Sequence, residues 1–259
     1  MDEPGEALAS QLAHYQEHGY ARLGPVLDEA ALQGLRERLD DLMLGRVAHP
    51  GLYFQLDAAA SNHQEAPAAL GWRGPSLDYR KIERLEKDER FLAIVRHPAI
   101  ERVVRARITG AVVLYRAIVF NKTTRGGGEV GWHQDGGRLW GLSQEPEVQV
   151  WTALDDAPLE GGCLEVLPGS HRLGLATPLG GVVPEDKLRA AGAEAKKVLL
   201  PAKAGESILL HNHLWHRSGQ TRTGRRRLGL SVCYMGAETR CLRKKRAPRE
   251  FFKVFDALP

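Results

Sequence analysis

The chain has 259 residues, of which 43% are hydrophobic and 26% are charged, and its formal net charge is +4. This length can bury a sizeable core, and the composition excludes an intrinsically disordered chain. The longest apolar stretches have the length of a strand, so no membrane span is expected, and the mild positive charge does not by itself predict a nucleic-acid partner.

The N-terminus and the cysteines indicate where the protein is found. Residues 1–4 lack the basic start and the apolar run of a secretory signal. Cys163, Cys233 and Cys241 are too few and too scattered for a disulfide framework. We therefore expect a protein that is not exported and that works in the reducing cytoplasm.

The first hundred residues carry mostly helical patterns. Leucines and a tyrosine between residues 8 and 15 share one helical face, and Gly19 is a plausible end of that helix. A short strand is expected over residues 19–23. Asp28 can cap a second helix, in which leucines recur every three or four residues up to Gly45.

The next part of the chain alternates between irregular and helical patterns. Residues 49–75 are rich in Pro, Gly, Ala and Asn, which predicts an irregular loop. A further helical stretch is expected over residues 87–107, with an interruption at Pro98.

After Ile108 the pattern changes to short strands separated by Gly and Pro. Six segments are rich in β-branched or aromatic residues: 112–121, 148–154, 163–167, 197–200, 206–211 and 228–235. Many short strands with turn signals between them favour a mainly β fold with flanking helices, either a sandwich or a barrel.

A histidine and an aspartate two residues apart form a candidate metal site. His133 and Asp135 point to the same side of an extended strand. Together with a distant histidine they would make the two-histidine, one-carboxylate set of non-haem Fe(II) oxygenases, although zinc also accepts such ligands. Strand alternation does not decide whether the third ligand is His211, His213 or His216.

Several ordered motifs resemble the phytanoyl-CoA dioxygenase family of 2-oxoglutarate-dependent oxygenases. They are His133-Gln134-Asp135, residues 150–154, residues 160–171 with Gly-Cys-Leu followed by Pro-Gly-Ser-His, residues 205–207, residues 215–219 and Arg227. The resemblance implies Fe(II), 2-oxoglutarate and O2 as the reactants at the site. It also implies a double-stranded β-helix, or jelly roll, in one domain over residues 1–259. The helical part would cover about 1–107, the jelly-roll core about 108–236, and a basic tail about 237–259.

The resemblance also assigns individual residues. The family's distal ligand precedes a residue-Ser-Gly step, which selects His216, and its cosubstrate arginine lies eleven residues further on, at Arg227. A guanidinium suits this role because it can form two parallel hydrogen bonds with a carboxylate. Alternation alone leaves Arg225 as a competing candidate.

Further candidates for contact with 2-oxoglutarate follow from the resemblance. They are Trp151, Ser218, Lys81 and Tyr115. Asn121 is added because it has the same strand parity as Tyr115.

The substrate is expected to be a small molecule, and the surplus of Arg and Lys suggests an anionic one. Arg138 and Trp140, in the segment 136–147, are candidates for the substrate pocket. Because the carboxylate of Asp135 is present where halogenating relatives have a small residue, the resemblance favours hydroxylation.

Three alternatives remain. A nucleic-acid demethylase is suggested by the basic tail, but residues 217–222 lack the corresponding Arg-x-Asn-x-Thr-x-Arg signature. A zinc hydrolase would need a base motif such as His-Glu-x-x-His, which the sequence lacks. A non-catalytic jelly-roll binding protein would have no need of three metal ligands together with Arg227.

Overall fold

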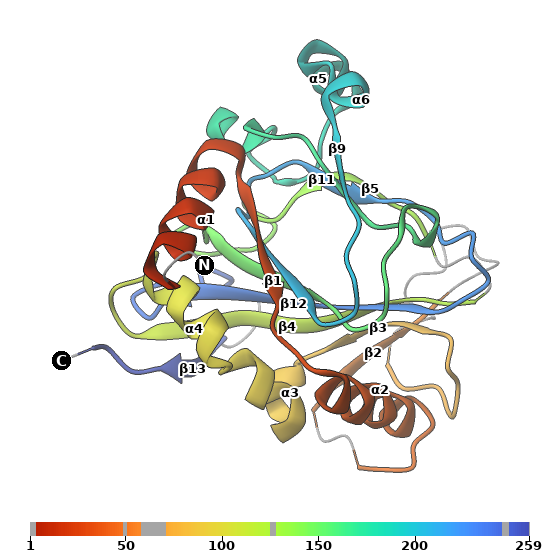
Figure 1. Cartoon of the computed structure of the whole chain (residues 1–259). Coiled ribbons are helices and arrows are strands. Elements are labelled where there is room, and N and C mark those ends of the chain that lie inside the picture. Colours follow the sequence, from red (N-terminus) through yellow and green to blue (C-terminus); the bar gives the residue numbers. More distant parts are fainter. Residues whose placement is uncertain (1–3, 49–50, 58–70, 125–127, 245–248, 259) are drawn as a thin grey trace.

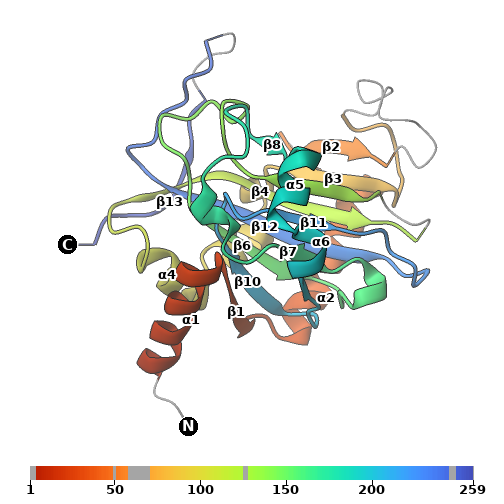
Figure 2. The same cartoon turned by 90° about the horizontal axis from the view of Figure 1, so that it is seen from above.

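Two antiparallel β-sheets form the centre of the molecule. The structure, a computed structural model, describes residues 4–48, 51–57, 71–124, 128–244 and 249–258. Figure 1 shows the smaller sheet above the larger one, with α2, α3 and α4 below the larger sheet. Seen from above in Figure 2, the strands of the two sheets overlie one another.

The elements follow one another in chain order. The helices are α1 (Pro4–His18), α2 (Glu29–Met43), η2 (Leu85–Lys87), α3 (Glu89–Val95), α4 (Pro98–Arg105), η3 (Leu159–Gly161), η4 (Ser170–Leu173), α5 (Glu185–Ala191) and α6 (Ala193–Lys196). The strands are β1 (Tyr20–Pro25), β2 (Tyr53–Leu56), β3 (Tyr79–Glu83), β4 (Val112–Lys122), β5 (Val130–Gln134), β6 (Val148–Ala153), β7 (Leu164–Val166), β8 (Gly181–Val182), β9 (Val198–Leu200), β10 (Glu206–Leu210), β11 (His216–Ser218), β12 (Arg227–Gly236) and β13 (Phe252–Phe255).

The connections between the sheets define a double-stranded β-helix. The larger sheet has the order β1-β10-β6-β12-β4-β3-β2, with β13 paired to β4, and the smaller sheet has the order β8-β5-β11-β7-β9. From β4 to β7, and again from β10 to β12, successive strands alternate between the two sheets. This arrangement confirms the predicted mainly β jelly-roll fold.

The second helix begins and ends where the sequence predicts. The Asp28 side chain accepts a hydrogen bond from the backbone N–H of Ala31 at 2.8 Å, which satisfies a free donor of the first turn. The chain leaves the helix through Gly45, whose φ of +68° suits glycine. The leucine face of α2 is buried, so this helix closes the outer side of the larger sheet.

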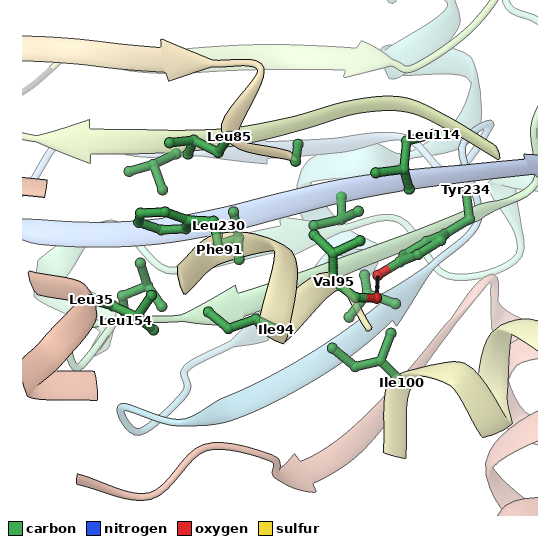
Figure 3. Packing of buried hydrophobic residues seen from close by; sticks show 14 of the residues in the cluster. Leu35, Leu85, Phe91, Ile94, Val95, Ile100, Leu114, Leu154, Leu230 and Tyr234 are labelled. Carbon is green, nitrogen blue, oxygen red and sulfur yellow. Dashed lines mark hydrogen bonds between the residues drawn. The ribbon is translucent and has the colours of Figure 1, made fainter. Parts of the chain in front are cut away.

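A continuous hydrophobic core joins these helices to the sheet. Phe91 and Ile94 of α3 belong to the same buried cluster as Leu114 and Leu230 of the sheet, and Figure 3 shows Phe91 beside Leu230. Within this core the hydroxyl of Tyr234 donates a hydrogen bond to the carbonyl oxygen of Val95 at 3.0 Å, so its burial leaves no unpaired polar group. The core thereby fixes the positions of β4 and β12.

Several parts of the fold differ from the predictions. Strand β2 lies inside the segment predicted as an irregular loop; residues 49–50 and 58–70 of that segment lie outside the described residues. Strand β3, strand β13 and the helical stretch 185–196 were not predicted. Strands β2, β3 and β13 have only four or five residues, too few to show a clear period, and neighbouring strands define them through pairing.

Among the described residues, none of the helices combines the length and the apolarity required to cross a bilayer.

Candidate metal centre

Two neighbouring strands of the smaller sheet bring the three predicted metal ligands together. His133 of β5 and His216 of β11 are direct cross-strand partners. Asp135 follows β5 by one residue, and its Oδ2 lies 3.8 Å from Nε2 of His216. One ligand atom from each residue lies within 4.8 Å of the other two. The arrangement offers two imidazoles and one carboxylate to a single ion.

Backbone carbonyl groups orient both histidines for metal binding. Nδ1 of His133 lies 2.8 Å from the carbonyl oxygen of Gly131, and Nδ1 of His216 lies 2.8 Å from that of Leu214. A carbonyl oxygen can only accept, so Nδ1 carries the proton in each ring. The lone pair therefore resides on Nε2, as a metal-binding imidazole requires.

The protonation states also suit a metal. Burial alone would raise the pKa of Asp135, but Arg116, whose Nη2 donates to Oδ1 at 3.0 Å, and the two histidines hold that pKa well below its usual range. Burial, with a smaller effect of His133, lowers the pKa of His216 to about 4. The site thus presents an ionised carboxylate and a neutral imidazole at neutral pH.

A cavity of about 260 Å³ adjoins the three ligands. Five of the residues predicted to contact 2-oxoglutarate line it: Lys81, Asn121, Trp151, Ser218 and Arg227.

Arg227 is the most informative of these residues. Its side chain is buried, its Nη2 donates to the carbonyl oxygen of Gly162, and its Cζ lies 5.5 Å from the ring centroid of Trp151. Its Nε has no hydrogen-bond partner in the structure. Burial lowers the pKa of Arg227 to about 10, so the guanidinium stays charged at neutral pH. A buried charge with a free donor fits a carboxylate ligand.

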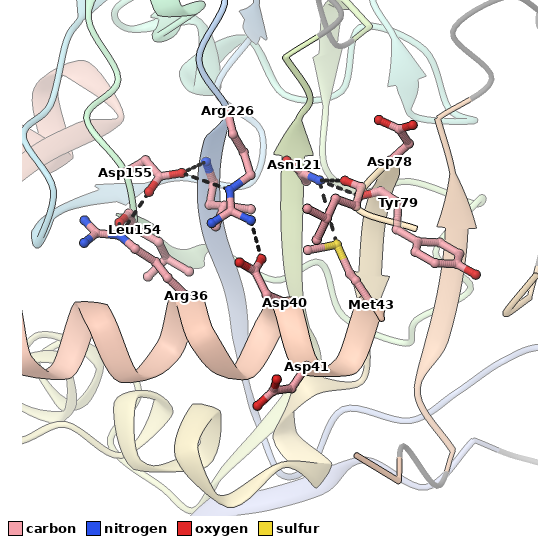
Figure 4. Close-up of polar contacts among 12 residues, drawn as sticks. Arg36, Asp40, Asp41, Met43, Asp78, Tyr79, Asn121, Leu154, Asp155 and Arg226 are labelled. Atoms are coloured by element: carbon pink, nitrogen blue, oxygen red, sulfur yellow. Dashed lines mark hydrogen bonds and ion pairs between the residues drawn. The ribbon is translucent and has the colours of Figure 1, made fainter. Parts of the chain in front are cut away.

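The two neighbouring arginines point elsewhere. Arg226 forms ion pairs with Asp40 of α2 and with Asp155, as Figure 4 shows. Arg225 is exposed and lines a different surface hollow. Of the two arginines with the same parity, the structure therefore places only Arg227 in the cavity of the metal ligands.

A β-bulge overturns the parity argument that joined Tyr115 to Asn121. Arg116 pairs with Cys233 and Leu114 with Tyr234, so Tyr115 is an extra residue in β4. Tyr115 consequently lines a second cavity, whereas Asn121 lines the cavity of the metal ligands.

The amide of Asn121 is already engaged. Its Nδ2 donates to the carbonyl oxygens of Leu77 and Tyr79 at 3.0 and 2.9 Å, as Figure 4 shows. Its Oδ1 has no partner in the structure.

The two predicted substrate-pocket residues lie apart from the metal ligands' cavity. Arg138 is exposed. Trp140 is buried, stacks on Tyr115 with ring centroids 4.1 Å apart, and lines the second cavity.

The lining also contains residues that were not predicted, among them Arg116, Lys122 and Gln149. Burial, together with the nearby Arg227, lowers the pKa of Lys122 to about 7. Arg116 and Lys122 lie on the same face of β4 beyond the bulge. The sequence did contain a signal for these two residues, because a lysine or arginine inside an otherwise apolar strand is seldom buried without a partner.

Comparison with known proteins identifies the family. The family model for phytanoyl-CoA dioxygenase (PhyH) matches residues 15–229. The chain belongs to this family. This member of the phytanoyl-CoA dioxygenase family is 30% identical over 158 residues to the mouse (Mus musculus) phytanoyl-CoA dioxygenase domain-containing protein 1. That match covers 58% of the chain and 54% of the mouse protein, so the chain spans about half the length of this relative.

Solved structures share the fold of this family member. The epimerase SnoN in complex with Fe3+, alpha ketoglutarate and nogalamycin RO has a TM-score of 0.72 at 18% identity, covering 98% of the chain and 96% of SnoN. EctD from S. alaskensis with 2-oxoglutarate and 5-hydroxyectoine has a TM-score of 0.71 at 20% identity, covering 93% of the chain and 81% of EctD. Both likenesses extend over nearly the whole jelly roll.

Proposed function

We propose that the protein is an Fe(II)- and 2-oxoglutarate-dependent oxygenase that hydroxylates a C–H bond of a small, anionic molecule. The observation that carries the proposal is one cavity that holds both the His133, Asp135 and His216 set and the buried guanidinium of Arg227. Nitrogen and carboxylate donors of this kind, on one face of the ion, are typical of non-haem Fe(II) sites. Membership of the phytanoyl-CoA dioxygenase family supports the same chemistry.

The residues of the chain would bind and orient the reactants. His133, Asp135 and His216 would hold the iron, and Arg227 would bind the distal carboxylate of 2-oxoglutarate through its free Nε. The bound iron and cosubstrate would supply the oxidising power, with O2 consumed and succinate and carbon dioxide released.

Other lining residues would complete the cosubstrate site. Trp151 would pack beside the Arg227 guanidinium, and Ser218 and Lys81 would contribute polar contacts from two strands. We propose no direct hydrogen bond from Asn121 to 2-oxoglutarate, because its Nδ2 already donates to the carbonyl oxygens of Leu77 and Tyr79. The structure places Tyr115 outside this lining, so we propose no cosubstrate contact for it.

An anaerobic titration tests the class and the residue roles together. Fe(II) and 2-oxoglutarate added to the protein should give the weak visible charge-transfer band of the chelate. His216→Ala should abolish the band, and Arg227→Ala should require roughly tenfold or more 2-oxoglutarate, since about 1.4 kcal/mol of lost binding corresponds to a tenfold change. Arg225→Ala is the matched control, because it removes an exposed arginine nearby. Absence of both the band and calorimetric 2-oxoglutarate binding in the wild type contradicts the proposal.

Isotope labelling tests the hydroxylation. Once a substrate is found, turnover under 18O2 should place one labelled oxygen atom in the product. A product without label would instead indicate epimerisation or desaturation on the same site.

A further inference from the structure

A second cavity, of about 570 Å³, lies next to the metal centre. Its size falls within the usual range for small-molecule pockets, about 300–1,000 Å³. Its lining contains four arginines, Arg84, Arg116, Arg243 and Arg249, together with aromatic side chains that include Tyr115 and Trp140. Arginines from four separated places in the chain therefore converge on one space.

Arg116 connects this cavity to the metal ligands. It belongs to the lining of both cavities, and its Nη2 donates to Oδ1 of Asp135 at 3.0 Å. The bulge in β4 makes this double role feasible, because it allows the consecutive residues Tyr115 and Arg116 to contribute to the same lining. A ligand in the second cavity would thus lie against the side chain that holds the metal-binding carboxylate.

The described side chains that line the second cavity include four arginines and one glutamate, Glu83. Two of the lining charges are paired, since Arg116 contacts Asp135 and Glu83 lies 2.6 Å from Lys81. Among the residues that the structure describes, Arg84, Arg243 and Arg249 form no ion pair.

The hydrogen bonds of two of these arginines go to backbone groups and not to carboxylates. Arg243 and Arg249 donate to the backbone carbonyl oxygens of Leu139 and Tyr115, which orients the guanidinium groups without neutralising them. Glu86 interacts electrostatically with Arg249 and Arg84, but its hydrogen bonds are made with backbone amides. Guanidinium groups held in this way are suited to a carboxylate or a phosphate.

The backbone of Arg84 gives independent support. Within the described part of the chain, Arg84 is the one non-glycine residue with a positive φ, at φ 65° and ψ 34°. This left-handed conformation costs free energy for a residue with a Cβ, and glycine would adopt it without strain. Strained residues of this kind concentrate at binding sites, and the Arg84 side chain lines the second cavity.

We propose that the second cavity binds an oxyanion group of the substrate, a carboxylate or a phosphate ester, against Arg84, Arg243 and Arg249. The Tyr115–Trp140 pair would form an apolar wall for the part of the substrate next to the anion, while Arg116 separates the anion from the metal centre. This inference rests on the proposed oxygenase function for the identity of the ligand as a substrate, and it deepens that proposal by assigning the recognition site.

Cys241 provides a readout that needs neither iron nor turnover. It lines the second cavity and is partly exposed, whereas Cys163 and Cys233 are buried. Hydrogen bonds from the backbone amides of Arg249 and Arg243 lower the pKa of the Cys241 thiol, which favours its alkylation. A ligand in the cavity should protect this thiol.

The test measures the rate of Cys241 alkylation with phenyl phosphate, with benzoate, and with uncharged benzamide as the probes. At least one of the two anions should slow alkylation, benzamide should not, and added salt should weaken the effect. Preference for phenyl phosphate would identify a phosphate ester, and preference for benzoate a carboxylate. Calorimetry on the protein loaded with 2-oxoglutarate should give the same order of affinities.

Two variants distinguish recognition from folding. Arg84→Gly and Arg243→Ala should each weaken anion binding tenfold or more, and Arg225→Ala should not change it. Because glycine relieves the strain, Arg84→Gly should keep or raise the melting temperature, so its loss of binding cannot reflect unfolding. The same anion binding should persist in His216→Ala.

The outcomes separate the two proposals. If the charge-transfer band forms but neither anion protects Cys241 nor binds in calorimetry, the recognition site is wrong and the oxygenase proposal stands. If anions bind to the wild type and to His216→Ala but no band forms in the wild type, the oxygenase proposal fails and the second cavity remains an anion site. Equal protection by benzamide would overturn the inference.

Discussion

At the scale of single residues, Gly229 controls where Arg227 and Trp151 lie. A Cβ atom at Gly229 would come 2.7 Å from Cζ2 and Nε1 of the Trp151 ring, closer than real side-chain contacts allow. Trp151 is itself buried beside the Arg227 guanidinium. The absence of a side chain at position 229 therefore allows the indole to lie across β12 and to pack next to the arginine.

The variant Gly229→Ala tests this arrangement. The added methyl group should displace Trp151, lower the free energy of unfolding by about 1–3 kcal/mol through overpacking, and weaken 2-oxoglutarate binding roughly tenfold. Metal binding should be retained, because the three ligands lie on other segments. Denaturant titration and 2-oxoglutarate calorimetry measure the two effects. The control is Gly110→Ala, where a Cβ would meet nothing within 4 Å; wild-type behaviour of Gly229→Ala would contradict the packing argument.

His211 is a second residue with a measurable consequence. Its Nδ1 accepts a hydrogen bond from the backbone N–H of His213 at 3.0 Å, which requires the neutral ring. Burial, with smaller contributions from His171 and His213, lowers the pKa of His211 from 6.5 to about 3. Between these values the unfolded chain binds a proton that the folded protein does not. The free energy of unfolding should therefore fall as the pH decreases below 6.5.

The His211→Asn variant isolates this contribution. Asparagine keeps an acceptor oxygen but does not titrate. Titration of His211 should lower the free energy of unfolding by at most about 1.4 kcal/mol per pH unit. Urea denaturation of both proteins at pH 7, 6 and 5 should show a smaller loss of stability in the variant. Parallel curves for the two proteins would mean that His211 does not titrate in this range.

At the scale of elements, local patterns predicted those parts of the fold that depend on short-range physics. The cap at Asp28 and the leucine spacing predicted α2, and the β-branched runs predicted β4, β6 and β12. The jelly-roll topology came only with the family resemblance, because alternation within a strand does not specify which strands pair.

Strand alternation placed His133 and Asp135 together, but it could not predict two other features of the candidate site. Alternation could not select His216, since residues 211–215 form a turn in which Leu214 N–H donates to the carbonyl oxygen of His211, and a turn resets the parity of the strand. The position of Arg116 depends on the bulge at Tyr115, which only the pairing with β12 reveals. The bulge depends on a long-range pairing, whereas the turn is a local interruption that strand alternation does not predict.

Asp155 connects two elements next to Arg227. It accepts hydrogen bonds from the backbone N–H of Leu228 at 3.0 Å and lies 3.0 Å from Nε of Arg36 of α2 and 3.8 Å from Nε of Arg226, as Figure 4 shows. The carboxylate thus fixes the first residues of β12 against α2, directly beside Arg227.

The variant Asp155→Asn should loosen this connection. Loss of the charge should cost about 1–2 kcal/mol of stability and should raise the concentration of 2-oxoglutarate needed for binding, because the start of β12 is held less firmly. Denaturation and calorimetry give both numbers. Asp41→Asn is the control, since it removes an exposed surface pair with Arg46 and should change stability by at most about 0.5 kcal/mol. If Asp155→Asn affects stability but leaves 2-oxoglutarate binding unchanged, the connection does not position Arg227.

At the scale of the whole molecule, the candidate site joins the two sheets. His133 and His216 belong to the smaller sheet, whereas Arg227 and Lys122 belong to the larger one. Helices α2, α3 and α4 pack against the outer face of the larger sheet and leave its inner face to the site. A metal ion with bound 2-oxoglutarate would therefore interact with both sheets at once and would stabilise the complete jelly roll rather than one segment.

Thermal unfolding tests this coupling. Under anaerobic conditions, Fe(II) and 2-oxoglutarate, each at about 100 times its dissociation constant, should each add about 2.7 kcal/mol to the stability of the fold, which corresponds to roughly 5–10 °C in melting temperature per ligand. In Arg227→Ala the metal should still stabilise, but 2-oxoglutarate should add little. In His216→Ala both increments should be lost, and a chelator should reverse the effect in the wild type. Mg²⁺ is the control ion, because it prefers an all-oxygen shell over imidazole nitrogen. Equal increments in all three proteins would show that the ligands bind away from this site and that the two sheets are not joined through it.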